Sequence, residues 1–241
     1  MFLRVSRVCR FMVTSMFAWM PLSVCADGST IDKVYHPYVV PLEIEVEWRT
    51  VVSFDDDDAV DDQQLHRLGI GYSPVESWFA EVYLIGEKKP NDAFALEAIE
   101  IEAKWQLTEQ GEYDADWGVL FEFEKQAQDE IWAVAVGLLV EKEWGRWVGA
   151  ANLFVEFEWG GDIKSELESA GALQLRYRYD RVFEPALEFY QSENTTGLGP
   201  VLMGNQRLGI GRKLHWEFGV IFGLNGRTPN QTVKALLEYE F

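Results

Sequence analysis

Apolar and polar residues alternate strictly along much of the chain. From Leu42 to Arg49, every even position is Leu, Ile, Val or Trp, and every odd position is Glu or Arg. Successive side chains of a β-strand point to opposite sides, so a period of two is typical of a strand with one apolar and one polar face. An α-helix would spread the same residues around its circumference. The pattern therefore favours strands, although glutamate itself favours helices.

The same alternation recurs along the chain and predicts twelve strands. Most of them have the roughly nine to eleven residues, or more, that a tilted strand needs to cross the hydrocarbon core of a bilayer. The stretch Ile131 to Val140 is apolar on both faces, which makes its strand the least certain member of the set. The predicted strands cover residues 40–54, 64–72, 77–87, 94–107, 116–125, 130–142, 146–159, 170–180, 183–191, 203–213, 215–224 and 231–241.

The connections between these segments fall into two alternating classes. Most connections after odd-numbered strands are long and polar, and most connections after even-numbered strands are tight. A membrane barrel with long loops at one end and short turns at the other has this arrangement. Two connections break the rule, because 108–115 is long and 126–129 is short. A miscounted strand would explain both, so a ten-stranded barrel is the alternative.

Alternation alone does not tell which face of the strands meets water. A soluble sandwich or a lipocalin-like barrel would bury the apolar face, whereas an outer-membrane barrel turns it toward lipid. The even number of strands, the two classes of connection and an N-terminal export signal favour the membrane barrel. We therefore predict an all-β fold, a transmembrane antiparallel up-and-down β-barrel of about 12 strands.

The first residues have the features of a secretory signal peptide. Three arginines precede an apolar stretch, and Val24-Cys25-Ala26 places small residues before a cleavage site after Ala26. We predict a signal peptide over 1–26, a periplasmic N-terminal segment over 27–39 and the barrel over 40–241. A membrane anchor and a lipoprotein acylated at Cys25 are the alternatives. Cleavage after Ala26 would remove Cys9 and Cys25, which are the only cysteines, and with them any disulfide framework.

Composition narrows the classes of function. The 241 residues carry 21 Lys+Arg against 40 Asp+Glu, a formal charge of −19, so a nucleic-acid partner is disfavoured because the polyanion would be repelled. The 14% aromatic content excludes a disordered acidic chain. We find no hydrolase, zinc-protease or nucleotide-binding motif, and the three histidines form no catalytic pattern. We expect no catalytic residues, no enzyme activity and no cofactor, with a barrel lipid hydrolase as the weaker alternative.

The last strand carries a second signal. It ends on Phe241, with Tyr239 two residues earlier and a polar Lys234 further back. This pattern resembles the C-terminal assembly signal of bacterial outer-membrane β-barrels, although Leu236 stands where that family prefers glycine. The resemblance implies insertion by the β-barrel assembly machinery and a final position in outer-membrane lipid.

A shorter stretch resembles a second family. The pentapeptide 67–71, Arg-Leu-Gly-Ile-Gly, leads through Ser73-Pro74 to Trp78 and another strand. It is similar to a hairpin of the phenol-degradation MetA-pathway barrel family. That resemblance implies a role in the uptake of small organic molecules.

The polar face of the predicted barrel is crowded with carboxylates. We expect them to line the lumen and attract cations, with three basic partners, Arg176, Arg178 and Lys234. Barrel closure should bring Glu238 and Glu240 to Glu43 and Glu45, and neighbouring strands should bring Glu156 and Glu158 to Arg176 and Arg178. The predicted lumen carboxylates are Glu43, Glu45, Glu47, Glu100, Glu102, Glu122, Glu124, Glu156, Glu158, Glu238 and Glu240.

These features predict a small passive channel or uptake barrel with a cation-preferring lumen. The alternative is a non-conducting structural or adhesive barrel with acidic surface loops, its lumen filled by its own salt bridges. The run Asp55, Asp56, Asp57 and Asp58 is a weak candidate for binding Ca²⁺. It lacks the spacing of an EF-hand loop, so a solvated charge run is the favoured interpretation and we predict no metal site. The sequence indicates no particular oligomeric state.

Overall fold

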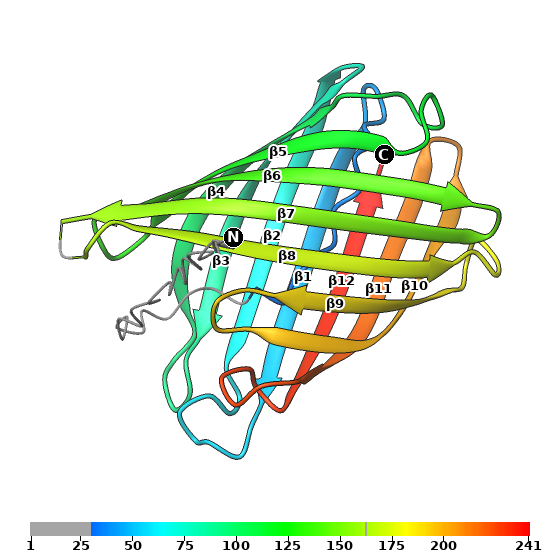
Figure 1. The fold of residues 1–241 in the computed structure, drawn as a ribbon. Helices are drawn as coiled ribbons and strands as arrows, with labels where there is room; N and C mark the ends of the chain where they lie inside the picture. Colours follow the sequence, from blue (N-terminus) through cyan, green and yellow to red (C-terminus); the bar gives the residue numbers. More distant parts are fainter. Residues whose placement is uncertain (1–29, 162) are drawn as a thin grey trace, which may run out of the picture.

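A computed structural model describes residues 30–161 and 163–241 of the chain. These residues form twelve antiparallel strands, each paired with its neighbours in sequence, and β1 pairs with β12 to close the barrel (Figure 1). The predicted signal peptide lies outside the described residues. The strands are β1 (Ile44–Phe54), β2 (Gln64–Val75), β3 (Trp78–Lys88), β4 (Ala95–Gln106), β5 (Asp116–Gln126), β6 (Ile131–Trp144), β7 (Trp147–Gly160), β8 (Glu166–Tyr177), β9 (Glu184–Gln191), β10 (Thr196–Gly209), β11 (Arg212–Gly223) and β12 (Gln231–Glu240).

The fold prediction is confirmed, including the number of strands. The long connection after β4 and the short one after β5 are both present in the barrel, so the ten-stranded alternative is wrong. Among the described residues, no helix is long and apolar enough to span a bilayer. We call the end of the barrel with the connections 145–146 and 210–211 the turn end, and the end with 55–63 and 224–230 the loop end.

The apolar face of the strands points outward. On β1, Glu47 and Arg49 are at most 2% exposed, whereas the apolar side chains of Val46 and Trp48 between them are 37% and 38% exposed. A soluble sandwich or lipocalin-like barrel would show the reverse, with apolar side chains inside. An apolar outer face suits surrounding lipid. Closure of the barrel also pairs the backbone N–H and C=O groups of the strands, which hydrocarbon cannot solvate.

This orientation makes a stability prediction for the lipid-facing surface. Leu138 lies at the middle of β6 and is 37% exposed on the outer face. Leu138→Arg should destabilise the barrel by about 2–4 kcal/mol, because a cation at the bilayer midplane loses its hydration. Tyr179→Arg, near the turn end, should cost about 0–1 kcal/mol. Urea unfolding in lipid vesicles, followed by tryptophan fluorescence, measures both, and equal losses at the two positions would contradict the membrane orientation.

Candidate functional site in the barrel lumen

Residues 30–39, which we call the lumen segment, run lengthwise through the barrel. At the loop end, the Thr30 hydroxyl donates to Ser192 Oγ at 3.2 Å. Near the turn end, the Tyr38 hydroxyl donates to Asp116 Oδ2 at 2.8 Å. The sequence analysis placed this stretch in the periplasm, and the structure instead places its described part inside the barrel. The physical reason is a set of apolar, hydrogen-bonding and ionic contacts with the strand walls.

Apolar contacts hold the lumen segment in two places. Ile31 and Val34 are at most 2% exposed and pack with a cluster on β7 to β11. Tyr35 packs with Leu120 on β5 and Leu139 on β6. Burying each such side chain contributes roughly 1.5–3 kcal/mol, so the segment is anchored by ordinary core packing as well as by charge. The wall residues of the first cluster are Ala150, Ala172, Tyr190, Val201, Met203 and Ile221.

A single asparagine satisfies both backbone groups of Tyr35, in the middle of the segment. The Asn152 amide accepts from the Tyr35 N–H at 2.7 Å and donates to the Tyr35 carbonyl at 2.9 Å. The Tyr35 hydroxyl donates to Glu102 at 2.8 Å and accepts from Arg49 at 3.0 Å. The lumen segment has no neighbouring strand to pair with, and a buried backbone N–H or C=O group without a partner is costly. The Asn152 side chain therefore takes the place of a paired strand at Tyr35.

Ion pairs complete the attachment. Asp32 lies 3.0 Å from a guanidinium nitrogen of Arg49 and 3.3 Å from one of Arg67. Lys33 pairs with Glu47 and also lies 3.3 Å from Glu238, and His36 contacts Glu141. The carboxylates of Glu47 and Glu238 around the Lys33 ammonium group offset the cost of burying that charge inside the barrel.

A cavity of about 390 Å³ lies beside the lumen segment and reaches the connections at the loop end. One side of it is formed by the segment and the other by the inner walls of β4, β5, β7 and β8. Carboxylates outnumber cationic groups in its lining, so its electrostatic potential favours cations. The acidic residues of the lining are Asp32, Glu97, Glu100, Glu122, Glu124, Asp129, Glu156, Glu158 and Glu168, and the basic ones are Lys33, Arg67 and Lys89.

The predicted lumen carboxylates occupy two regions. Glu100, Glu122, Glu124, Glu156 and Glu158 line the cavity. A second group lies toward the turn end, where β12 meets β1 in the register Glu47 with Glu238 and Glu45 with Glu240. Glu102 is 2% exposed beside Arg49, and Glu43 precedes β1.

The basic partners lie elsewhere than expected. Glu156 is opposite Glu168 in the β7–β8 pair, whereas Arg176 is opposite Val148, near the turn end. Arg176 and Arg178 therefore do not reach Glu156 or Glu158, and the predicted pairing is wrong. The nearest carboxylates are instead Glu184, 3.3 Å from Arg176; Glu143, 2.5 Å from Arg178; and Glu188, 2.8 Å from Lys234.

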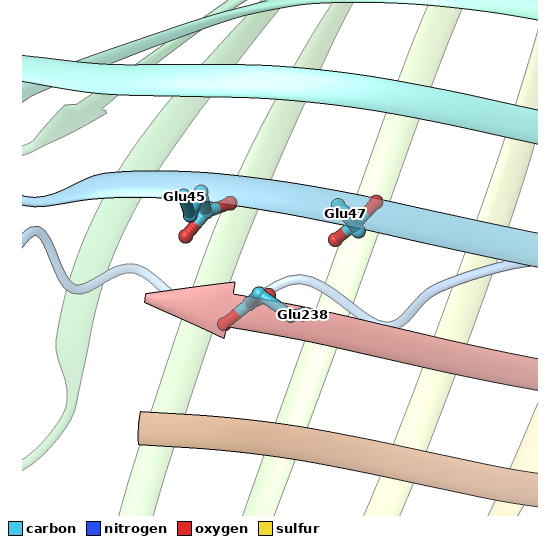
Figure 2. Close-up of side chains that lie close together, drawn as sticks. All are labelled: Glu45, Glu47 and Glu238. Carbon is cyan, nitrogen blue, oxygen red and sulfur yellow. The ribbon is translucent and has the colours of Figure 1, made fainter. Parts of the chain in front are cut away.

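The acidic loop 55–58 uses its carboxylates to hold its own backbone. Asp55 accepts from the N–H groups of Asp57 and Asn230, and these hydrogen bonds lower its pKa. Within the described part of the chain, one group of three or more side chains has the spacing of metal ligands, and it lies elsewhere: Glu45, Glu47 and Glu238 (Figure 2). The sequence analysis expected carboxylates to meet at the β1–β12 closure but did not interpret them as ligands.

Solved structures share this architecture at low sequence identity. An outer-membrane channel from Pseudomonas putida F1 has a TM-score of 0.55 at 13% identity, covering 86% of this chain and 98% of the channel. The fold is that of an outer-membrane β-barrel. The KdgM porin gives 0.54 at 10% identity, over 82% of this chain and 99% of the porin. The translocator domain of autotransporter NalP from Neisseria meningitidis gives a TM-score of 0.51 at 12% identity, covering 84% of this chain and 89% of the domain.

No family model and no curated protein sequence matches the chain. The resemblance of residues 67–78 to the MetA-pathway family stays a prediction, as does the assembly role of the last strand. In the barrel, Lys234 faces the lumen, and the rings of Tyr239 and Phe241 stack with centroids 5.7 Å apart. The Phe241 N–H donates to the Ile44 carbonyl at 2.9 Å, which ties the chain end to β1.

Proposed function

We propose that the protein is a cation-preferring channel or uptake barrel of the bacterial outer membrane, with the lumen segment as its resident plug. The observation that carries the proposal is the acidic cavity, which lies inside a wall whose outer face is apolar. The likeness in fold to a porin and an outer-membrane channel supports it. The proposal includes contact with membrane lipid and insertion by the assembly machinery, and it assigns no catalytic step.

Cation preference follows from the charge of the cavity. Nine carboxylate residues and three basic residues line it. A low-dielectric wall focuses such a field, so cations concentrate in the cavity and anions are repelled. An ion entering the barrel from the loop end would meet this field beside the lumen segment.

The ion preference is tested by recording the purified barrel in a planar bilayer under a KCl gradient. We expect a reversal potential of the sign that marks cation permeation. Glu122→Gln with Glu124→Gln should move it toward zero, because both carboxylates line the cavity. Asp57→Asn, on an exposed loop, is the matched control and should leave it unchanged. Anion preference in the wild-type barrel would refute the proposal.

One observation favours a second candidate, a non-conducting structural or adhesive barrel. The lumen segment makes contacts on β1, β4, β7 and β9, so it bridges walls on different sides of the barrel. A permanently filled lumen would leave the acidic loops as the functional surface. A barrel that stays closed after the segment has been loosened would support this second function.

A further inference from the structure

Two buried carboxylates and a partly buried one meet where β12 closes the barrel on β1. Oxygens of Glu45, Glu47 and Glu238 all lie within 4.8 Å of one another. Figure 2 shows Glu45 and Glu47 on β1 and Glu238 on the adjacent strand β12. Calcium binds oxygen ligands at about 2.3–2.6 Å, so two ligands on opposite sides of one ion are separated by about 4.6–5.2 Å. The observed spacing matches that requirement.

A fourth carboxylate points to a missing ligand at the same place. Glu81 on β3 is across from Gly71, and Gly71 is across from Glu45, so no side chain separates the two acids. The Glu81 carboxyl group lies within hydrogen-bonding reach of Glu45. Glu81 is only 5% exposed, yet its Oε1 has no hydrogen-bond partner among the described residues. Two carboxylates in contact need a proton or a cation between them.

A small void lies on one side of Glu81. It measures about 10 Å³ and is lined by Glu81, Glu102, Lys33 and Lys104 among others, and not by Glu45, Glu47 or Glu238. That volume is about the size of one water-sized probe, which is close to the minimum for one bound water molecule. Replacing a glycine would close the approach from β2, since a Cβ at Gly71 would lie 2.6 Å from Glu81 Cγ.

Lys33 and Arg49 supply the cluster with its present counter-charge. The Lys33 ammonium group pairs with Glu47 and lies 3.3 Å from Glu238 Oε2, and Arg49 Nε lies 2.6 Å from Glu47 Oε1. We propose that Glu45, Glu47, Glu81 and Glu238, the carboxylate cluster, form a binding site for a divalent cation of the calcium type. The cation competes with Lys33 for Glu47 and Glu238. Binding at this site is independent of whether the barrel conducts.

Calorimetric titration of the detergent-solubilised protein with Ca²⁺ tests the site. Glu45→Gln with Glu81→Gln should weaken the saturable binding at least about tenfold, because carboxylate number sets calcium affinity. Lys33→Met should strengthen it by a similar factor, because the competing ammonium is gone. This opposite pair of shifts separates a built site from general attraction to an acidic protein.

The control is Asp56→Asn with Asp58→Asn in the exposed loop, which should leave the saturable binding unchanged. Heat-modifiable gel mobility shows whether each variant is folded. The Lys33→Met variant keeps all four ligands, so it tests the proposal even where the glutamine variant fails to fold. The proposal is overturned by the absence of saturable Ca²⁺ binding in both the wild type and Lys33→Met. It is also overturned by binding that follows the loop aspartates.

Discussion

Replacing Tyr35 and Asn152 with alanine should raise the single-channel conductance of the barrel at least about tenfold. Tyr35 is packed against Leu120 and Leu139, and Asn152 makes both hydrogen bonds to its backbone. Truncating a buried aromatic costs about 3–5 kcal/mol, and each lost hydrogen bond adds about 0.5–1.5 kcal/mol. A loss of about 1.4 kcal/mol changes an equilibrium constant tenfold. These losses should therefore shift the equilibrium toward a state in which the lumen segment has left the lumen and water fills the space.

A reversible lock provides the control for this experiment. The hydroxyl oxygens of Thr30 and Ser192 are 3.2 Å apart, so sulfurs at these positions need only a small shift to reach the disulfide length of about 2.05 Å. Thr30→Cys with Ser192→Cys, added to the alanine variant, should restore the low conductance when oxidised and release it on reduction. Tyr72→Ala, on the outer face, should have no effect.

Two results would contradict the plug. The first is wild-type conductance in the alanine variant, which would favour the structural or adhesive barrel. The second is a raised conductance that persists in the oxidised lock, which would place the conducting path somewhere other than the space taken by the lumen segment.

The period-two pattern was sufficient to predict the strands and which side chains share a face. Each of those features depends on neighbouring residues alone, as in β1, where glutamates and apolar residues alternate. The boundary of β10 was missed, because Gly197, Gly199 and Pro200 resemble a loop. In the barrel, Gly199 is a close approach, since a Cβ there would lie 1.9 Å from the Val220 carbonyl oxygen. Pro200 lies where the regular pairing with β11 is interrupted.

The lumen segment was not predictable from its own residues. Its sequence has no period, and Asp32 and Lys33 resemble any solvated pair until the strands around them are placed. Their partners, such as Arg49 and Glu238, lie on β1 and β12, far apart in sequence, and meet only when the barrel closes. The same dependence on register explains why Arg176 was assigned to the wrong carboxylates.

Arg49→Met should destabilise the folded barrel by about 3–5 kcal/mol, because it removes the cation shared by several buried carboxylates. The guanidinium lies 2.6 Å from Glu47, 3.3 Å from Glu102 and 3.0 Å from Asp32, and Arg49 is 2% exposed. It also lies over the ring of Tyr83, 4.7 Å from the centroid. Methionine keeps much of the volume but leaves the acids to repel one another without their shared cation.

The urea midpoint in detergent micelles measures this loss, and two further variants separate charge from geometry. Arg49→Lys keeps the charge but loses the planar fork, so its loss should be intermediate. Adding Glu102→Gln to Arg49→Met should recover part of the stability, because one of the uncompensated charges is then removed. Equal losses for Lys and Met, with no recovery from Glu102→Gln, would mean that Arg49 acts through packing alone. The buried carboxylates of the lumen would then not depend on Arg49 for charge compensation.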